Sequence, residues 1–381
     1  MMGQLNYYPG IWGNGAMANY SDSLGLLARI HEAYGIAAFR IRPFGPVWRL
    51  SAPGGEYGLK RFKLCGEQLQ DLAGSLDGLR KAGFPHLAQF LPTKSGAPWI
   101  TLAGRNYILS PWYDGANPDF KNPEHLTKVA RLFGKLHSVS AQLAPAPNFN
   151  QQIGLLKYRD RTDFLSRILE TLNQRDCSPR LNLQRRTRYG LNRIDRGILK
   201  SGPQFLAQAE VCMKQYITYV PDIWLTGLGP GARPVPGREL LPAGFCHQDP
   251  ASRNLILHGG ELILIDFELS GPDLFIHEVT TLLNRSLEAN QWNEDVFWLV
   301  VNAYQMERPL SPLEIKLLPY LLLFPQRFWR ICRQRYEEDL HWTEKRFARR
   351  FHQIIDQEAN RVRFLKKWFP HDLQVIHDSL R

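Results

Sequence analysis

The segment that most constrains how this chain can fold spans residues 244–268 and reads GFCHQDPASRNLILHGGELILIDFE. Two short apolar runs in it flank His-Gly-Gly, and glycine supplies the positive φ that a tight turn needs, so the segment predicts a β-hairpin. Asp249 and Asn254 lie in the polar loop before the first strand, and Asp266 follows the second. The hairpin would bring two carboxylates and an amide to one end, which is the set of groups that phosphoryl transfer requires.

The motif His-x-Asp-x-x-x-x-Asn, followed after an apolar strand by Asp-Phe-x, resembles the protein-kinase catalytic core. It resembles more closely the aminoglycoside phosphotransferase branch of that superfamily, which has an acidic residue, here Glu268, in place of the glycine of Asp-Phe-Gly. Within the branch, His-Gln-Asp with Arg253 before the Asn is similar to the CotS-type spore-coat kinase-like proteins. A lone His-x-Asp would favour a polar loop without chemistry, but the joint spacing favours the kinase-like core.

The resemblance implies an α+β, two-lobed protein-kinase-like fold with a small antiparallel-sheet N-lobe and a mainly helical C-lobe. We expect a lead-in and helix over residues 1–36, the N-lobe with its hinge over 37–115, and the C-lobe with the catalytic loop over 116–381. A helical insert over about residues 141–241 falls where aminoglycoside- and choline-kinase-like proteins build the wall of the acceptor site.

The composition is typical of an ordered globular protein in a reducing compartment such as the cytosol. The chain has 381 residues with 44% hydrophobic residues, and its five cysteines are scattered without paired spacing. The start of the chain has no basic stretch before an apolar core, and the longest apolar run, Leu317–Phe324, is too short to span a bilayer. We therefore expect a cytoplasmic location, with the spore coat as the alternative that the resemblance raises.

The formal net charge of +11 can indicate binding to nucleic acid or to an acidic surface. It also suits an enzyme that binds ATP and a phosphorylatable substrate. No RNA-binding aromatic signature, zinc spacing or recognition-helix pattern accompanies the charge, so we expect no specific nucleic-acid partner.

The N-terminal part carries the pattern of a small sheet with flanking helices. Apolar periodicity and turn signals predict helices over Ser23–Tyr34 and Glu67–Ala82, and strands over Ala37–Arg42, Val47–Ser51 and Glu56–Phe62. Three antiparallel strands of this kind are how a kinase-like small lobe begins.

The resemblance places the phosphate-binding lysine of the family at Lys60, on the third of these strands. An exposed strand lysine beside Arg61 and Lys63 is equally supported by the strand pattern alone. In the family an acidic residue on the next helix pairs with this lysine. Glu67 and Asp71 are the candidates, with Glu67 the better match, and a solvated acid in the first helical turn is the alternative.

Two further strands, Trp99–Leu102 and Tyr107–Pro111, lead into Ser-Pro-Trp-Tyr-Asp-Gly, which resembles the interlobe hinge of the family. Backbone groups at Ser110 and Trp112 would contact the adenine edge, because the proline between them lacks an N–H. The first hairpin, Arg42–Pro46, has one glycine between prolines and no Gly-x-Gly-x-x-Gly. Small-molecule kinases of this branch often lack that motif.

Helices are also predicted over residues 122–138, 155–173, 193–217, 274–287, 294–306, 312–335 and 343–368. Between them, residues 141–152, 180–196 and 226–241 are expected to be connecting segments, the second of them basic. An anionic acceptor or partner could meet that basic segment, and a solvated basic face is the alternative. The 274–287 helix begins with His277-Glu278 in place of the Asp-Leu pair that ties down the catalytic loop in the family. This departure leaves open how firmly the catalytic loop is held and whether the protein is fully active.

Together these features imply an ATP-dependent phosphotransferase that acts on a hydroxyl of a small molecule or of a spore-coat or cell-envelope component. Asp249 would orient the hydroxyl and accept its proton, while Asn254 and Asp266 would hold Mg²⁺, which prefers oxygen ligands. The residues assigned to ATP are Lys60, Glu67, Ser110, Trp112 and Asp266.

The alternative is a catalytically weak or inactive kinase-like protein that serves the spore coat as a scaffold and has coat proteins as partners. The missing glycine loop and the His277-Glu278 pair favour this alternative, whereas the intact set of Asp249, Asn254 and Asp266 favours the enzyme. The sequence carries no motif that identifies the acceptor.

Overall fold

The computed structural model describes residues 20–143, 155–177, 191–220, 241–338 and 342–367. The predicted lead-in before Tyr20 lies outside these ranges, as do most of the predicted connecting segments. The described chain divides into two compact units: the first takes in the residues up to Pro118 together with Ser252–Ser270, and the second takes in the rest. Within the described ranges, no helix is both long enough and apolar enough to cross a bilayer.

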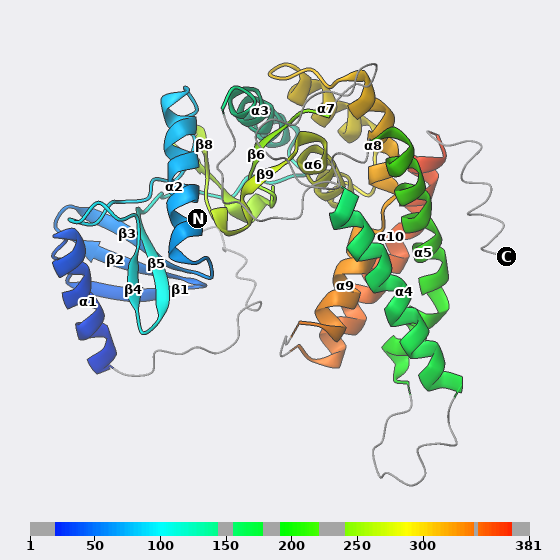
Figure 1. Cartoon of the computed structure of the whole chain (residues 1–381), viewed down its shortest axis with the longest axis horizontal. Coiled ribbons are helices and arrows are strands. Elements are labelled where there is room, and N and C mark those ends of the chain that lie inside the picture. Colours follow the sequence, from blue (N-terminus) through cyan, green and yellow to red (C-terminus); the bar gives the residue numbers. More distant parts are fainter. Residues whose placement is uncertain (1–19, 144–154, 178–190, 221–240, 339–341, 368–381) are drawn as a thin grey trace, which may run out of the picture. The chain divides into compact units, whose positions relative to one another are not determined.

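The first unit is built on a five-stranded antiparallel sheet in the order β1-β2-β3-β5-β4 (Figure 1). The strands are β1 (Arg40–Phe44), β2 (Val47–Ala52), β3 (Gly55–Phe62), β4 (Ile100–Leu102) and β5 (Arg105–Pro111). Leu50, Leu59 and Leu109 point to one face, because side chains alternate along a strand, and they form a core cluster with Leu26 and Ile30 of α1 (Tyr20–Tyr34). The predicted antiparallel start of the small lobe is confirmed.

Helix α2 (Gly66–Lys81) follows β3 and buries four leucines at helical spacing. The predicted hairpin is also present, as β7 (Leu255–His258) paired with β8 (Glu261–Leu264). Its two-residue turn, Gly259-Gly260, has φ angles of 57° and 88°, which glycine adopts at little cost. Backbone hydrogen bonds join the hairpin to the segment after α2 in the same unit, at 2.9 Å from the Leu264 amide to the His86 carbonyl and 2.8 Å from the Ala88 amide to the Leu264 carbonyl.

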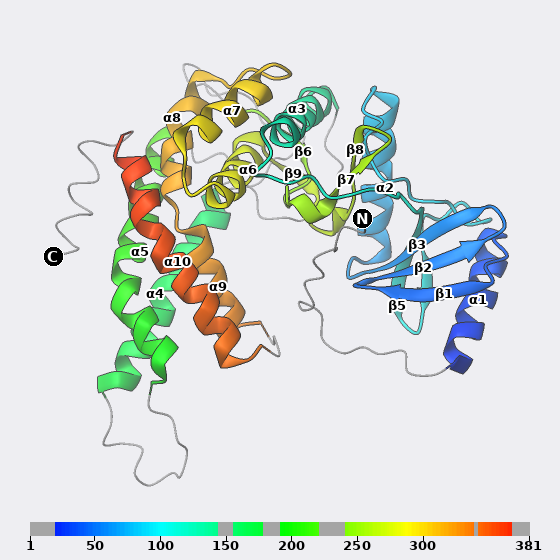
Figure 2. The ribbon, with the colours of Figure 1, turned by 180° about the vertical axis from the view of Figure 1, so that it is seen from behind.

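The second unit is mainly helical. Its helices are α3 (Pro123–Ser140), α4 (Leu155–Cys177), α5 (Arg193–Tyr219), α6 (Phe275–Ala289), α7 (Glu294–Gln305), α8 (Pro312–Leu323), α9 (Gln326–Tyr336) and α10 (Glu344–Lys366). Figures 1 and 2 both show α4, α5, α9 and α10 lying side by side, and α3 packs against α6 and α7. Two short strands, β6 (Ala243–Cys246) and β9 (Gly271–Leu274), pair with each other, and both contact α6.

Two predictions about this unit are wrong. The single helix expected over residues 312–335 is two helices, α8 and α9, separated at Phe324-Pro325. Proline lacks the N–H that would continue the helix and pushes the preceding residue out of the helical region, so Phe324 has a ψ of 128°. The segment of residues 269–273, between Glu268 and the helix predicted from residue 274, was expected to be the loop that leaves the metal site, but residues 271–274 form β9. Their pairing with β6 could not be read from so short a segment containing Pro272.

Candidate active site

The polar loop before the hairpin is held by helix α6. The buried carboxylate of Glu278 accepts hydrogen bonds from the backbone amides of His247, at 3.0 Å, and Gln248, at 2.5 Å. Gln248 has a φ of 65°, a conformation that costs free energy for a residue other than glycine, and the two hydrogen bonds offset that cost. The departure from the Asp-Leu pair therefore does not leave the loop without an anchor, because the glutamate side chain is long enough to reach both amides.

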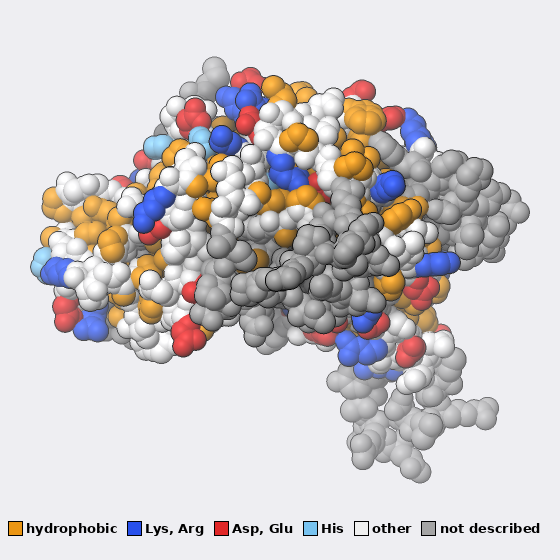
Figure 3. All heavy atoms as spheres, turned by 45° about the horizontal axis from the view of Figure 1, so that its top comes forward, with side chains coloured by type: hydrophobic (Ala, Val, Ile, Leu, Met, Phe, Trp, Pro, Cys, Tyr) orange, Lys and Arg blue, Asp and Glu red, His pale blue; other side chains and the backbone are white. Residues whose placement is uncertain are grey.

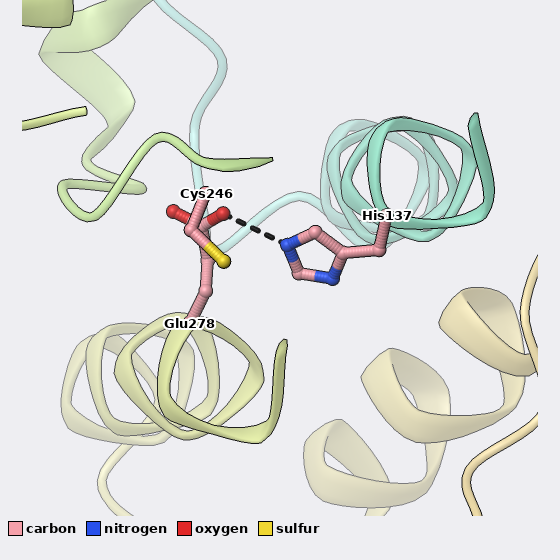
Figure 4. A group of neighbouring side chains, drawn as sticks. All are labelled: His137, Cys246 and Glu278. Carbon is pink, nitrogen blue, oxygen red and sulfur yellow. Dashed lines mark hydrogen bonds and ion pairs between the residues drawn. The ribbon is translucent and has the colours of Figure 1, made fainter. Parts of the chain in front are cut away.

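Glu278 also belongs to a buried chain of hydrogen bonds. In Figure 4, the His137 ring of α3 points at Glu278, with Nε2 2.9 Å from Oε2, and Cys246 lies beside the pair. The other ring nitrogen, Nδ1, lies 2.7 Å from the hydroxyl of Tyr304, which accepts from Arg308 at 2.9 Å. Because Arg308 can only donate, the Tyr304 proton goes to Nδ1, and a neutral imidazole donates its Nε2–H to Glu278.

The cluster of His137, Cys246 and Glu278 has ligand atoms within 4.8 Å of one another, which raises the question of a metal. Burial raises the pKa of the Cys246 thiol well above its ordinary value, so the thiolate that a metal needs is disfavoured. Both nitrogens of His137 and both carboxylate oxygens of Glu278 already have hydrogen-bond partners. We therefore interpret the cluster as the support of the loop.

Protonation of His137 should destabilise the protein. Burial lowers the pKa of His137 below its ordinary 6.5, although Glu278 opposes the shift, so the unfolded chain takes up the proton first as pH falls. The stability due to the neutral ring is complete above about pH 6.5 and is lost as pH falls below it, by at most about 1.4 kcal/mol per pH unit. Urea midpoints measured between about pH 7.5 and 5.5 should fall more steeply for the wild type than for His137→Gln. Parallel profiles would contradict this assignment.

Asp249, the predicted catalytic residue, forms an ion pair with Arg285 of α6, from Oδ1 to Nη2. Arg285 was not among the predicted site residues. It follows Glu278 by seven residues, so both side chains lie on one face of α6, and both reach the loop from His247 to Asp249. The sequence signal that could have identified Arg285 is this two-turn spacing from the acid of the His277-Glu278 pair, which stands where the family has its anchoring Asp-Leu pair.

Helix α4 reaches the same loop through Lys157, whose ammonium lies 3.1 Å from Gln248 Oε1 and 3.1 Å from Asp273 Oδ2. Asp273 is buried and also accepts from the ring of His277 at 2.7 Å. Burial alone would raise the pKa of Asp273, but Lys157 and His277 outweigh it and hold the pKa well below its ordinary value. The insert is thereby connected to the loop by a charged hydrogen-bond network.

In the first unit, the structure brings Lys60 of β3 against Asp266, the residue that follows β8, in an ion pair between Nζ and Oδ1. Asp266 has a φ of 67°, the second left-handed non-glycine residue at the site. Asn254 ends a 3₁₀ turn, and its carbonyl accepts from the amide of Ile265 at 3.0 Å. The hairpin therefore places Asn254 and Asp266 at one end, as predicted, while Asp249 belongs to the second unit.

The two acids on α2 differ in their surroundings. Glu67 is exposed in the first turn, whereas Asp71, one turn later, is half-buried. One carboxylate oxygen of Asp71 is fully buried and has no hydrogen-bond partner in the part of the chain that the structure describes. In the same described part, Lys60 makes its ion pair with Asp266 and with neither of these acids.

The predicted hinge continues the pairing of β5 with β3. Ser110 Oγ lies 3.4 Å from the carbonyl of Gly58, and the amide of Trp112 donates to the carbonyl of Glu56 at 2.9 Å. The amide of Trp112 is therefore engaged within the protein. Among the described residues the amide of Tyr113, the next residue, makes no hydrogen bond, so it could donate to a ligand.

The first hairpin closes on a two-residue turn, Gly45-Pro46, between the paired residues Phe44 and Val47. A turn this short offers only one N–H, since proline has none. It cannot cradle a phosphate group with a row of amides as a glycine-rich loop does. The structure thus explains how this unit can lack the glycine motif: the strands turn too tightly for such a loop.

The comparisons with known proteins agree with this fold. The chain is 21% identical over 323 residues to spore coat protein S of Bacillus subtilis (strain 168), covering 84% of this chain and 86% of that protein. An aminoglycoside phosphotransferase from Alicyclobacillus acidocaldarius superposes with a TM-score of 0.67 at 20% identity, covering 91% of this chain and 94% of its own. A spectinomycin phosphotransferase in complex with AMP superposes with a TM-score of 0.64 at 12% identity, covering 90% and 97%.

These similarities confirm the two-lobed kinase-like fold and the resemblance to CotS-type proteins that the sequence predicted. A model of the phosphotransferase enzyme family matches residues 45–297, which include the four strands of the sheet after β1, the hairpin, the loop with Asp249 and helix α6. The chain belongs to the phosphotransferase enzyme family.

Proposed function

We propose that this phosphotransferase transfers the γ-phosphoryl group of ATP to a hydroxyl of a small molecule or of a coat component. The observation that carries the proposal is the ion pair between Lys60 and Asp266, two residues 206 positions apart in the sequence. This pairing supports Lys60 as the cation that meets the phosphates, and Asp266, with Asn254, as the ligands of the metal. The similar spectinomycin phosphotransferase was solved with AMP, which supports a nucleotide as the donor.

In the transfer, the acceptor oxygen forms a bond to the γ-phosphorus, and the bond from that phosphorus to the bridging oxygen breaks, releasing ADP. Asp249 orients the acceptor hydroxyl and takes its proton, and Arg285 holds the Asp249 carboxylate in place. Asn254 and Asp266 offer amide and carboxylate oxygens, a donor set that fits Mg²⁺, which would neutralise phosphate charge when bound.

For the nucleotide-bound state, the structure favours Asp71 over Glu67 as the partner of Lys60. A buried carboxylate oxygen without a hydrogen bond costs free energy, and a lysine ammonium would satisfy it. At the adenine edge, the backbone carbonyl oxygens of Ser110 and Trp112 would accept hydrogen bonds from the base, and the amide of Tyr113 would donate one to it.

The second candidate function is a coat or scaffold role with weak or no activity. Two observations favour it: the tight Gly45-Pro46 turn, which cannot hold phosphates, and the similarity to spore coat protein S. A nucleic-acid partner would rest on the net charge of +11 alone. On the face in Figure 3, Lys and Arg side chains of the described residues are interspersed with acidic and apolar ones and form no single basic patch.

Replacing Lys60 should weaken ATP binding. A charge-assisted contact is worth about 1.5–3 kcal/mol, so Lys60→Ala should lose roughly tenfold to hundredfold in affinity for ATP with magnesium. The measurement is a melting scan with and without ATP and magnesium, because a ligand that binds the native state raises the midpoint by mass action.

The matched control is Lys63→Ala, which removes the same charge three residues later, at an exposed position past the end of β3. It should melt with the wild-type ATP shift. If the two variants keep equal shifts, Lys60 does not contact the nucleotide; if the wild type itself shows no shift, the scaffold role becomes the better account.

A further inference from the structure

An open pocket of about 720 Å³ lies in the second unit, lined by α4 and α9, which pack against each other (Figures 1 and 2). Gln248, the residue before Asp249, also lines it. If Asp249 acts on the acceptor hydroxyl as proposed above, a molecule in this pocket is next to the catalytic loop. The chemistry of the pocket then determines which class of acceptor fits.

The notable side chain in the pocket is Arg161 of α4. Its guanidinium lies 4.4 Å from the ring centroid of Trp329 and 5.5 Å from that of Tyr158, and Nη1 donates to Gln326 Oε1 at 2.8 Å. Stacking and this hydrogen bond fix the plane of the guanidinium. Burial lowers the pKa of Arg161, so its positive charge has lost much of its hydration.

Arg161 has no carboxylate within ion-pair distance among the residues that the structure describes. The buried arginines elsewhere in this unit differ, since Arg308 pairs with Glu314, Arg335 with Asp195 and Arg361 with Glu358. A partly desolvated charge without a partner costs free energy, and an anion from outside would recover it.

The other charges of the pocket do not supply that anion. Lys157 already has Asp273 as its partner, and Glu337 lies 3.8 Å from Arg333. Asp160 and Asp163 line the pocket from exposed positions on α4, where water screens them. The Asp273 carboxylate also acts on Arg161 at longer range, but its ion pair is with Lys157. The desolvated charge of the pocket that has no ion-pair partner among the described residues is therefore positive, which is the wrong sign for a polycationic acceptor.

We propose that this pocket binds a hydroxylated acceptor that carries an anionic group, a carboxylate or a phosphate, and that Arg161 holds this group. The planar fork of a guanidinium matches two oxygens of either anion. Gln248 borders the same pocket on the side of the catalytic loop.

The test uses four compounds that share one chain of hydroxyls: glucitol, which is neutral, gluconate, glucitol 6-phosphate, and the amine glucamine. Their binding to the full-length protein without nucleotide is measured by calorimetry at constant ionic strength. Gluconate or glucitol 6-phosphate should bind roughly tenfold or more tightly than glucitol, and glucamine should bind no better than glucitol. The tighter of the two anions identifies the group that the pocket takes.

Arg161→Gln should abolish the preference for the anions and leave glucitol binding unchanged. Arg350→Gln is the matched control, because Arg350 is a half-buried guanidinium stacked on Trp342 that does not line the pocket. It should keep the preference. Equal binding of all four compounds, no binding of any, tightest binding of glucamine, or loss of the preference in both variants would each overturn the proposal.

A failure of this proposal can be distinguished from a failure of the proposed phosphoryl transfer. Both variants should keep the wild-type melting shift with ATP and magnesium, since neither residue is among those assigned to the nucleotide. A missing ATP shift would count against phosphoryl transfer, whereas a missing anion preference would count only against Arg161.

Discussion

Asp249→Asn should lower phosphoryl transfer by about 100-fold to 10,000-fold, the range typical of a lost general base. The substitution keeps the shape of the side chain but removes the oxygen that accepts the proton and the charge that pairs with Arg285. ATP binding should change little, because the residues assigned to the nucleotide are elsewhere in the chain. The measurement is ADP release over time, with the melting shift by ATP and magnesium as the test of binding.

Two results would show that Asp249 has another role. One is a variant that releases ADP at the wild-type rate. The other is a variant that loses activity and the ATP shift together, since this would indicate a collapsed site. Circular dichroism of the variant without ligand distinguishes collapse from a change in chemistry.

Glu278→Ala should destabilise the protein by about 3–5 kcal/mol, among the largest effects of any single change. The Glu278 carboxylate is 1% exposed and accepts hydrogen bonds from the His137 ring and from the His247 and Gln248 amides. Removing it leaves these buried donors without an acceptor. Glu278→Gln should cost less, about 1–3 kcal/mol, because its one oxygen can still accept while its NH₂ group faces donors.

Urea unfolding midpoints and slopes measure these losses. Glu307→Gln serves as the control in the same unit, because Glu307 pairs with Arg131 at the surface and should change stability by no more than about 0.5 kcal/mol. If Glu278→Gln were as stable as Glu307→Gln, the carboxylate would not be supporting the loop. A further expectation is that Glu278→Gln slows ADP release more than it weakens ATP binding, since it acts through the loop that carries Asp249.

The parts of the fold that the sequence could predict are those that local chemistry decides. The hairpin was predictable because Gly259-Gly260 permits the φ angles of its turn, and α2 was predictable because its leucines recur at helical spacing. The break at Pro325 was also readable locally, since proline rarely continues a helix, but the apolar pattern running through it favoured one helix.

The parts of the site that could not be predicted depend on contacts between distant residues. Lys60 and Asp266 were both proposed from motif positions, but the sequence does not show that they pair. Arg285 and Asp249 meet because α6 passes beside the loop, which no local pattern reveals. The reach of Glu278 to two amides depends on one methylene group and on the rotamer it adopts, neither of which the family motif encodes.

The way Glu278 holds the loop bears on how inactive members of such families are recognised. A screen that requires aspartate at the anchoring position would classify this chain as a pseudokinase, since His277-Glu278 stands there. The two amides of His247 and Gln248 are nevertheless satisfied by a carboxylate. Whether a family member has lost its catalytic loop anchor is therefore better judged by whether any acidic side chain reaches those two amides. The residue type at a single aligned position is a poorer criterion.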